Sequence, residues 1–91
     1  MKVSFEETFI EKLNDQVRYI SKDKPQAARK FKSDLIAKLK KDLTQPFLFK
    51  KSIYFENIRD YVFKVYTCVY EIDVEQNCIV IFGFIKYKNS L

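Results

Sequence analysis

The fold is decided by residues 58–87, which read IRDYVFKVYTCVYEIDVEQNCIVIFGFIKY. Tyr, Val, Phe and Ile dominate this stretch, and these residue types favour strands. No apolar stripe with helical spacing can be drawn through it. We therefore expect three strands, over 58–63, over 66–74, and from 77 or 78 to about 87. The short turns between them, at 64–65 and 75–76, indicate an antiparallel meander.

The last of these strands should be the buried centre of the meander. It contains an unbroken apolar run, which is typical of a strand covered on much of both faces, whereas the strand before it carries two carboxylates and should be half solvated. A two-residue turn between them would pair Cys78 with Asp73 and Cys68 with Gly83. The two thiols would then not face each other, and we expect no disulfide.

Two amphipathic helices precede the meander. The sequence Lys-Asp-Lys-Pro at 22–25 predicts a tight corner between them, because Pro disfavours helix for the residue before it and fits the first turn of the next helix. The second helix should run from about Pro25 to Leu43. The apolar stripes consist of Phe9, Leu13, Val17 and Ile20 in the first helix, and of Ala28, Phe31, Leu35, Leu39 and Leu43 in the second.

The N-terminal residues complete the element order. Met1 to Phe5 is interpreted as a short strand, and Ser4 with Glu7 three residues later as a capping box that begins the first helix. The order is strand, two-helix hairpin, then three-stranded meander, and the hairpin can bury its stripes against one face of the sheet. The predicted fold class is a small α+β sandwich, with residues 1–91 forming a single domain.

The residue types that are rare in the chain exclude several kinds of function. There is no His, which removes His-based catalytic triads and the usual nitrogen ligand of zinc. One Gly cannot make a phosphate-cradling loop, which needs several. The two Cys, separated by nine residues, match neither a zinc half-site nor a redox pair. We expect no metal site and no cofactor.

The chain shows no sign of a membrane segment or an export signal. Its longest apolar run, 78–85, is far shorter than the roughly 18 to 20 residues that span a bilayer. Glu6, Glu7 and Glu11 stand where a secretory signal would have an apolar stretch after a basic start. We expect a cytoplasmic protein with no membrane partner.

The positive charge is unevenly distributed. The chain has 17 Lys and Arg against 12 Asp and Glu, a formal net charge of +5, and the excess lies in residues 22–51. A lysine-rich helix is often only a solvated face, but such clusters also bind phosphate backbones. With the cations near the strand ends, the candidate nucleic-acid-binding residues are Lys38, Lys41, Lys50, Lys51, Lys64 and Lys88.

A smaller group of candidate catalytic residues lies near the strand ends. Arg59, Lys86 and Tyr87 combine cations with an aromatic ring that can stack on a base, as in RNA-binding proteins. Alternatively, Tyr87 is an ordinary strand aromatic and the lysines only protect an exposed strand end. Cleavage of RNA without His would require a Tyr or Lys whose pKa is lowered by neighbouring positive charge.

Four motifs occur in order along the chain. They are Tyr19-Ile20-Ser21 followed by 23–28 and Phe31, then Asn57-Ile58-Arg59-Asp60, then Tyr66-Thr67-Cys68-Val69-Tyr70-Glu71-Ile72, and last Ile81-Phe82-Gly83-Phe84-Ile85-Lys86-Tyr87. In this order and at this spacing they resemble the RelE/ParE superfamily of toxins from bacterial type II toxin-antitoxin systems. The resemblance extends over nearly the whole chain.

This resemblance implies a toxin that arrests growth and is held inactive by a cognate antitoxin protein, whose extended and helical segments wrap its surface. Superfamily members divide broadly into ribosome-dependent mRNA endonucleases, which act on the ribosome with its mRNA, and inhibitors of DNA gyrase, the ParE branch. We place the endonuclease slightly ahead, because Tyr87 lies among cations and the basic second helix suits ribosomal RNA. The nuclease branch usually has Arg where this chain has Thr67. A third reading is therefore a non-enzymatic module, descended from such a toxin, that binds nucleic acid or protein.

Overall fold

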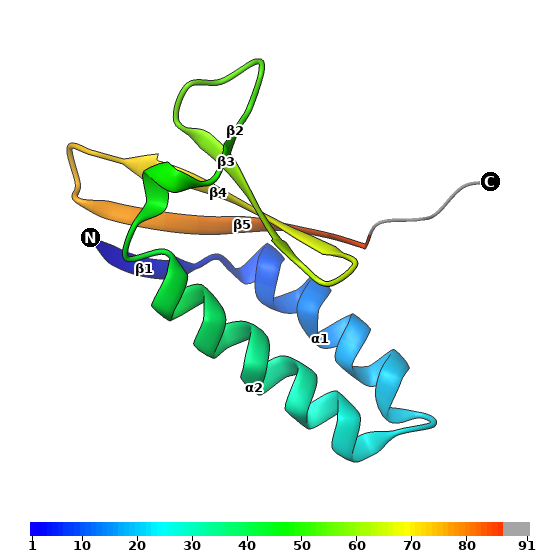
Figure 1. The fold of residues 1–91 in the computed structure, drawn as a ribbon. Coiled ribbons are helices and arrows are strands. Elements are labelled where there is room, and N and C mark those ends of the chain that lie inside the picture. Colours follow the sequence, from blue (N-terminus) through cyan, green and yellow to red (C-terminus); the bar gives the residue numbers. More distant parts are fainter. Residues whose placement is uncertain (87–91) are drawn as a thin grey trace.

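The computed structural model describes residues 1–86 and has an α+β architecture (Figure 1). Two long helices follow a first strand and precede the rest of the sheet, as the sequence predicts. The elements are β1 (Lys2–Phe5), α1 (Glu7–Ser21), α2 (Pro25–Asp42), the 3-10 helix η1 (Pro46–Leu48), β2 (Lys50–Lys51), β3 (Ile58–Phe63), β4 (Tyr66–Asp73) and β5 (Cys78–Lys86).

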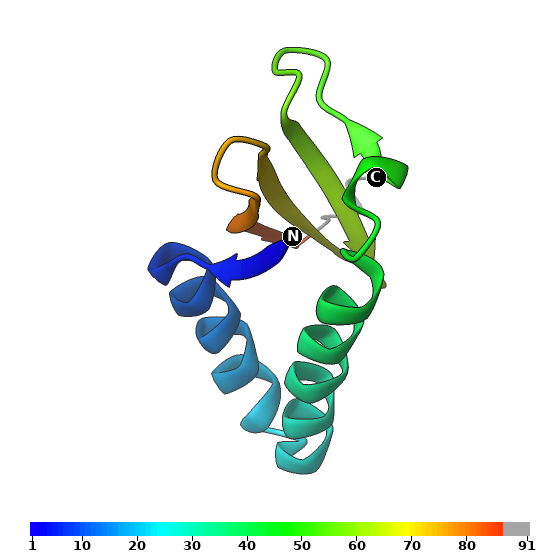
Figure 2. The ribbon, with the colours of Figure 1, turned by 90° about the vertical axis from the view of Figure 1, so that its left-hand side faces the viewer.

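One five-stranded sheet contains all the strands, in the order β1-β5-β4-β3-β2. The predicted antiparallel meander is confirmed as β3, β4 and β5. β1 pairs parallel to β5 on one side, and the two-residue strand β2, which the sequence did not predict, pairs antiparallel to β3 on the other. The helical hairpin lies against one face of this sheet (Figures 1 and 2).

The core lies between the helices and the sheet. The predicted stripes are confirmed: Phe9 and Leu13 of α1 are buried, Val17 and Ile20 are partly buried against the core, and all five stripe residues of the second helix are buried. On β5, however, burial alternates, with Ile79 and Ile81 buried and Val80 between them half-exposed. The prediction that both faces of this strand are covered is thus only half right, since the helices cover one face.

The register between β4 and β5 contains a bulge. Asp73 pairs with Cys78 as predicted, but Cys68 pairs with Phe84, because the ladder shifts by one residue between Val69 and Tyr70. Gly83, opposite Val69, allows close approach: a Cβ built on it would lie 3.0 Å from the Val69 Cβ. Both cysteines are free thiols.

The start of α1 differs from the predicted capping box. Ser4 lies inside β1, paired with Val80, and the N-cap residue of α1 is Glu6, whose side chain makes no capping hydrogen bond. The parallel ladder explains the difference, since the Glu6 backbone N–H donates to the carbonyl of Ile81 at 2.9 Å and so extends the strand geometry past Ser4. The corner before α2 is as predicted, with Pro25 as its first residue.

Two further observations concern membrane-spanning helices and metal ligands. No helix within residues 1–86 is both long enough and apolar enough to span a bilayer. In the same part of the chain, no three His, Cys, Asp or Glu side chains are grouped in a way that could hold a metal ion.

Candidate functional site

Arg59, a predicted catalytic residue, lies near the start of β3 and is engaged with the chain segment before β2. Its Nη1 donates to the carbonyl oxygens of Phe47 at 3.0 Å and Phe49 at 2.9 Å. The guanidinium carbon also lies 5.4 Å from the centre of the Phe47 ring, a cation–π arrangement. The Arg59 side chain therefore holds the segment around η1 against the sheet.

Two tyrosines fasten the same segment from the sheet. The Tyr61 hydroxyl donates to Asp42 Oδ2, and the buried Tyr70 hydroxyl donates to the carbonyl oxygen of Pro46, both at 2.5 Å. Burial raises the pKa of Tyr70 to about 12, although the positive charge of Arg59 opposes this shift. Burial and the hydrogen bond to Asp42 raise the pKa of Tyr61, and burial raises that of Tyr66. All three hydroxyls therefore remain protonated near neutral pH and cannot act as a general base there.

Lys86, the second predicted catalytic residue, lies at the other end of the sheet. Its Nζ is 5.7 Å from the centre of the Tyr19 ring of α1. Around it is a shallow cavity of about 340 Å³, lined by Lys12, Asp15, Gln16, Tyr19, Phe84 and Lys86. Tyr87 and Lys88, which follow directly in the sequence, lie outside the described residues.

The structure does not bring Arg59 and Lys86 together. Through their ladders, Arg59 is opposite Tyr70 and Lys86 is opposite Tyr66 on β4, and four strand residues correspond to about 13 Å. The meander itself predicts this separation, because β3 and β5 run in the same direction on either side of β4, and the start of β3 is therefore level with the start of β5 and not with its end. In this arrangement the Arg59 guanidinium is held at η1 and the Lys86 ammonium lies by Tyr19, so the two charged groups are directed to different parts of the structure.

The predicted nucleic-acid-binding lysines are spread over three places. Lys50 and Lys51 form the edge strand β2, opposite Asp60 and Arg59. Lys64 occupies the β3–β4 turn with a left-handed backbone (φ 56°), at the same end of the sheet as Lys86. The remaining two described lysines, Lys38 and Lys41, are exposed on α2. These positions do not form one continuous track.

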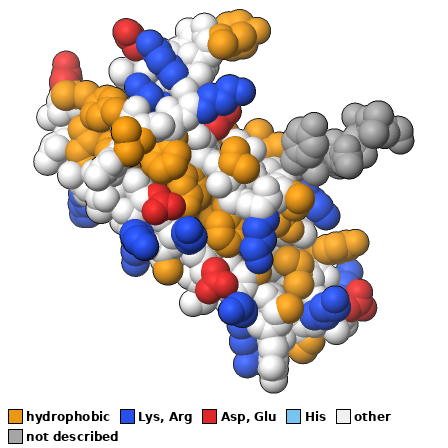
Figure 3. Space-filling model, in the orientation of Figure 1, with side chains coloured by type: hydrophobic (Ala, Val, Ile, Leu, Met, Phe, Trp, Pro, Cys, Tyr) orange, Lys and Arg blue, Asp and Glu red, His pale blue; other side chains and the backbone are white. Residues whose placement is uncertain are grey.

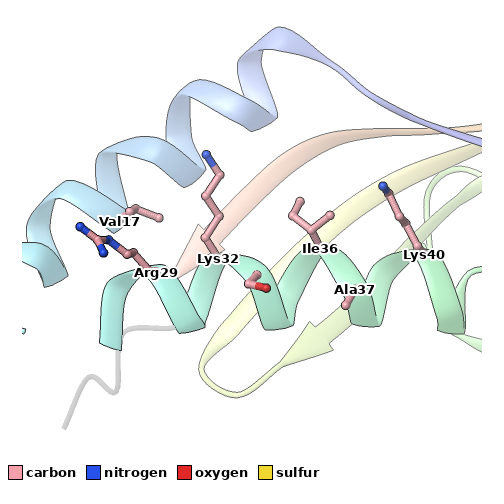
Figure 4. A pocket seen from close by; sticks show the side chains of 7 residues that line it. Val17, Arg29, Lys32, Ile36, Ala37 and Lys40 are labelled. Atoms are coloured by element: carbon pink, nitrogen blue, oxygen red, sulfur yellow. The ribbon is translucent and has the colours of Figure 1, made fainter. Parts of the chain in front are cut away.

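A groove of about 590 Å³ lies between the two helices (Figure 4). Val17 contributes from α1 and the rest of the lining comes from α2. Its apolar floor has a cationic border and no carboxylate. The lining residues are Val17, Arg29, Lys32, Ser33, Ile36, Ala37 and Lys40. The sequence held a signal for it, since positions 29, 33, 36 and 40 recur at helical spacing on one face.

A comparison with models of protein families identifies the class of protein that has this sequence and fold. A family model matches residues 3–88, which is nearly the whole chain, and the proteins that it describes are toxins of type II toxin-antitoxin systems. The particular family is the ParE toxin of parDE systems, and this chain belongs to it. Membership implies a cognate antitoxin as partner. No curated protein matches the chain closely enough to count as a relative.

Proposed function

We propose that this toxin arrests growth in the cytoplasm by binding and inhibiting DNA gyrase. The family match supports the ParE branch of the superfamily over its nuclease branch. The observation that carries the proposal is the engagement of Arg59, whose Nη1 is already used by two backbone carbonyls. This use of Nη1 stabilises the fold and ties the guanidinium to the η1 segment, so its two Nη1 hydrogens are not available to a scissile phosphate.

The chemistry of RNA cleavage supports the same choice. Attack by a 2′-hydroxyl needs a group that takes its proton and a cation that stabilises the charged phosphorane. The buried hydroxyls of Tyr61, Tyr66 and Tyr70 have raised pKa values, opposite to the change that a base requires. Arg59 and Lys86 lie at opposite ends of the sheet. Within the described residues, these candidates do not assemble into a nuclease centre.

The groove between α1 and α2 suits the antitoxin. Its apolar floor and its border of Arg29, Lys32 and Lys40 fit an amphipathic segment with apolar and acidic side chains. Lys32 is held in place by donating from Nζ to Asn14 Oδ1 at 2.8 Å. In this proposal Ile36→Asp weakens the antitoxin complex at least tenfold, because it puts a carboxylate on the apolar floor. Isothermal titration with the purified antitoxin measures the change, and an unaltered affinity would contradict this placement.

The function is tested with purified components. We expect the toxin to inhibit supercoiling by gyrase and to leave mRNA on translating ribosomes intact. In cells, thymidine incorporation should fall before amino-acid incorporation. Tyr87→Phe serves as the discriminating variant, since a nuclease that uses this hydroxyl loses rate by orders of magnitude whereas a gyrase inhibitor does not depend on its proton transfer. Ribosome-dependent mRNA cleavage with normal supercoiling would refute the proposal and favour the endonuclease.

A further inference from the structure

The cavity of about 340 Å³ around Lys86 lies between α1 and the end of β5. We call it the α1–β5 site. It shares no lining residue with the groove between the helices, and it lies at the end of the sheet that is far from Arg59. Its volume is at the lower end of the range of about 300–1,000 Å³ that is typical of small-molecule sites. The α1–β5 site is therefore separate from the surfaces assigned so far.

The α1–β5 site exists because β5 is longer than β1. β1 pairs only with the stretch from Cys78 to Ile81, and beyond Ile81 the strand β5 pairs with β4 alone. α1 lies along this free edge, where the Thr8 hydroxyl donates to the carbonyl oxygen of Phe82 at 3.2 Å. One face of α1 therefore takes the place of a further strand and forms a wall of the site.

The apolar base and the polar wall of the site are fixed by packing. The buried Phe84 ring stacks on Tyr66 with ring centres 5.1 Å apart, and it meets the Phe9 ring edge-on at 5.8 Å. On the wall, Gln16 Nε2 donates to the Tyr66 hydroxyl at 2.9 Å, which orients the amide and leaves its carbonyl oxygen and second N–H for a ligand. A ligand thus meets groups that are already in place, so that little ordering is needed on binding.

The α1–β5 site has two cations that no carboxylate within residues 1–86 neutralises. Lys12 and Lys86 are exposed, and neither forms an ion pair in that part of the chain. Asp15 also lines the site, but it is engaged by Arg18 in an ion pair. On the face that Figure 3 shows, Lys and Arg side chains are scattered among apolar ones and form no continuous track. Binding of an anion therefore depends on individual sites such as this one, where two ammonium groups are available.

An exposed aromatic ring lies beside these cations. The Tyr19 ring is 64% exposed, and Lys86 Nζ lies over it at 5.7 Å from the ring centre. Lys12, Gln16 and Tyr19 recur at spacings of four and three, so that a cation, an amide and a ring follow one another on one face of α1. The exposed ring can stack on a second ring, and the cations are then in reach of a charged group attached to that second ring.

We infer that the α1–β5 site binds a nucleotide unit, with its base stacked on Tyr19 and its phosphate between the ammonium groups of Lys12 and Lys86. An aromatic ring for the base and cations for the phosphate are the two elements by which proteins bind the nucleotides of an unpaired strand. The Gln16 amide can also exchange hydrogen bonds with the edge of a base, most favourably with adenine. The inference goes beyond the proposed function and does not depend on it, since it concerns a ligand of the toxin and not the inhibition of gyrase.

The combination of groups favours a nucleotide over a bare anion or an acidic peptide. Inorganic phosphate or a glutamate side chain would use only the two cations, and the exposed Tyr19 ring and the oriented Gln16 amide would then have no role. A nucleotide uses all of these groups together. A free nucleotide and a nucleotide within a single strand present the same base and phosphate, and the experiment below separates these two sources.

The inference is tested by NMR titration of the isotope-labelled full-length toxin with deoxyadenosine monophosphate. We expect the backbone amide signals of residues 12–19 and 84–86 to shift, with a dissociation constant of roughly 1 mM or below at low salt. Tyr19→Ala should weaken binding at least fivefold, because a base loses its stacking partner, and Tyr19→Trp should retain binding. The matched control is Tyr54→Ala, which removes an exposed tyrosine outside the α1–β5 site and should bind like the wild type.

The charge of the site is tested with a second pair of variants. Lys12→Gln combined with Lys86→Gln should weaken binding at least fivefold at low salt and reduce its dependence on salt. Lys38→Gln combined with Lys41→Gln is the control, because it makes the same change in net charge at exposed positions of α2 and should leave binding unchanged. Circular dichroism shows that each variant keeps the fold, as expected for exposed side chains.

Three further probes separate the sources and the competing ligands. Tighter binding of a short single-stranded oligodeoxythymidylate at the same amides identifies a single strand as the source, whereas equal or weaker binding identifies the free nucleotide, and both results support the inference. Inorganic phosphate or a short oligoglutamate peptide that binds there as tightly as the nucleotide overturns it. The inference is also overturned if these amides do not shift, if either test variant keeps the wild-type affinity, or if the control lysine variant loses as much affinity as the test variant.

Discussion

Replacing Arg59 with Ala should destabilise the fold substantially, whatever it does to toxicity. The substitution removes two hydrogen bonds from a charged donor to the carbonyls of Phe47 and Phe49, and a cation–π contact with the Phe47 ring. Hydrogen bonds to charged groups contribute about 1.5–3 kcal/mol each and an exposed cation–π contact about 0.5–1 kcal/mol. The removal of Nε, which is buried without a hydrogen-bond partner, offsets part of this loss.

We expect a net loss of about 3 kcal/mol in the free energy of unfolding for Arg59→Ala. A chain of 91 residues has a total of roughly 5–14 kcal/mol, so the variant should still fold, but less stably. For a domain of this size the midpoint of thermal unfolding should fall by about 12–24 °C. Arg59→Lys should lose less, because an ammonium can still donate to one of the two carbonyls.

The assay is urea denaturation of the purified toxin followed by circular dichroism, with ΔG from linear extrapolation. Arg18→Ala is the matched control: Arg18 forms an exposed ion pair with Asp15 on α1, and such pairs contribute little. If Arg59→Ala unfolds within about 0.5 kcal/mol of the wild type, a difference typical of a surface substitution, and yet abolishes growth arrest, the structural role of Arg59 is refuted and a direct functional role is favoured.

Three further predictions concern residues of β4 and β5. Tyr70→Phe removes the hydrogen bond to the carbonyl oxygen of Pro46 and should lower the free energy of unfolding, measured by thermal denaturation, by about 1–3 kcal/mol. Because the pKa of Tyr70 is raised to about 12, the wild type should also lose stability between pH 10 and 12, where the unfolded chain ionises first, and the variant should lose less. A thiol reagent should label half-buried Cys78 before Cys68, whose burial raises its pKa to about 12, and equal rates would contradict this order. Gly83→Ala should cost about 1–3 kcal/mol, and Val69→Ala in the same chain should recover part of it, as a double-mutant cycle would measure.

Most of the fold could be predicted because its signals are local. The corner between the helices depends on Pro25, which begins α2, and the β3–β4 turn depends on two residues between two strand-like runs. The prediction of a capping box was wrong because Ser4 pairs with β5 in the parallel ladder, a contact between segments far apart in the sequence. The predicted pairing of Cys68 with Gly83 was wrong because of the bulge between Val69 and Tyr70. Alternation of residue types shows which side chains share a face of the sheet, but not where one strand carries an extra residue.

The candidate site was harder to predict than the fold, because the acceptors of Arg59 are backbone carbonyls. A carbonyl leaves no trace in residue type, so nothing in the sequence around Phe47 marks it as the partner of an arginine twelve positions later. The strand β2 has the same difficulty, since Lys50 and Lys51 carry no strand signal and pair only because β3 lies alongside. An arginine near a strand end therefore resembles a catalytic group whether it meets a phosphate or the chain itself.

The role of Arg59 affects how toxicity data on this family member should be interpreted. The residue fastens η1 through the carbonyl oxygen of Phe47, and the side chains of Phe47 and Leu48 of η1 are exposed. Loss of Arg59 removes the hydrogen bonds that hold this segment against the sheet, and the lower stability of the toxin then reduces toxicity without the loss of any contact to the target. A nontoxic Arg59 variant is consequently no indication of nuclease chemistry. Only a variant that keeps the stability of the toxin while losing its activity identifies a residue that acts on the target directly.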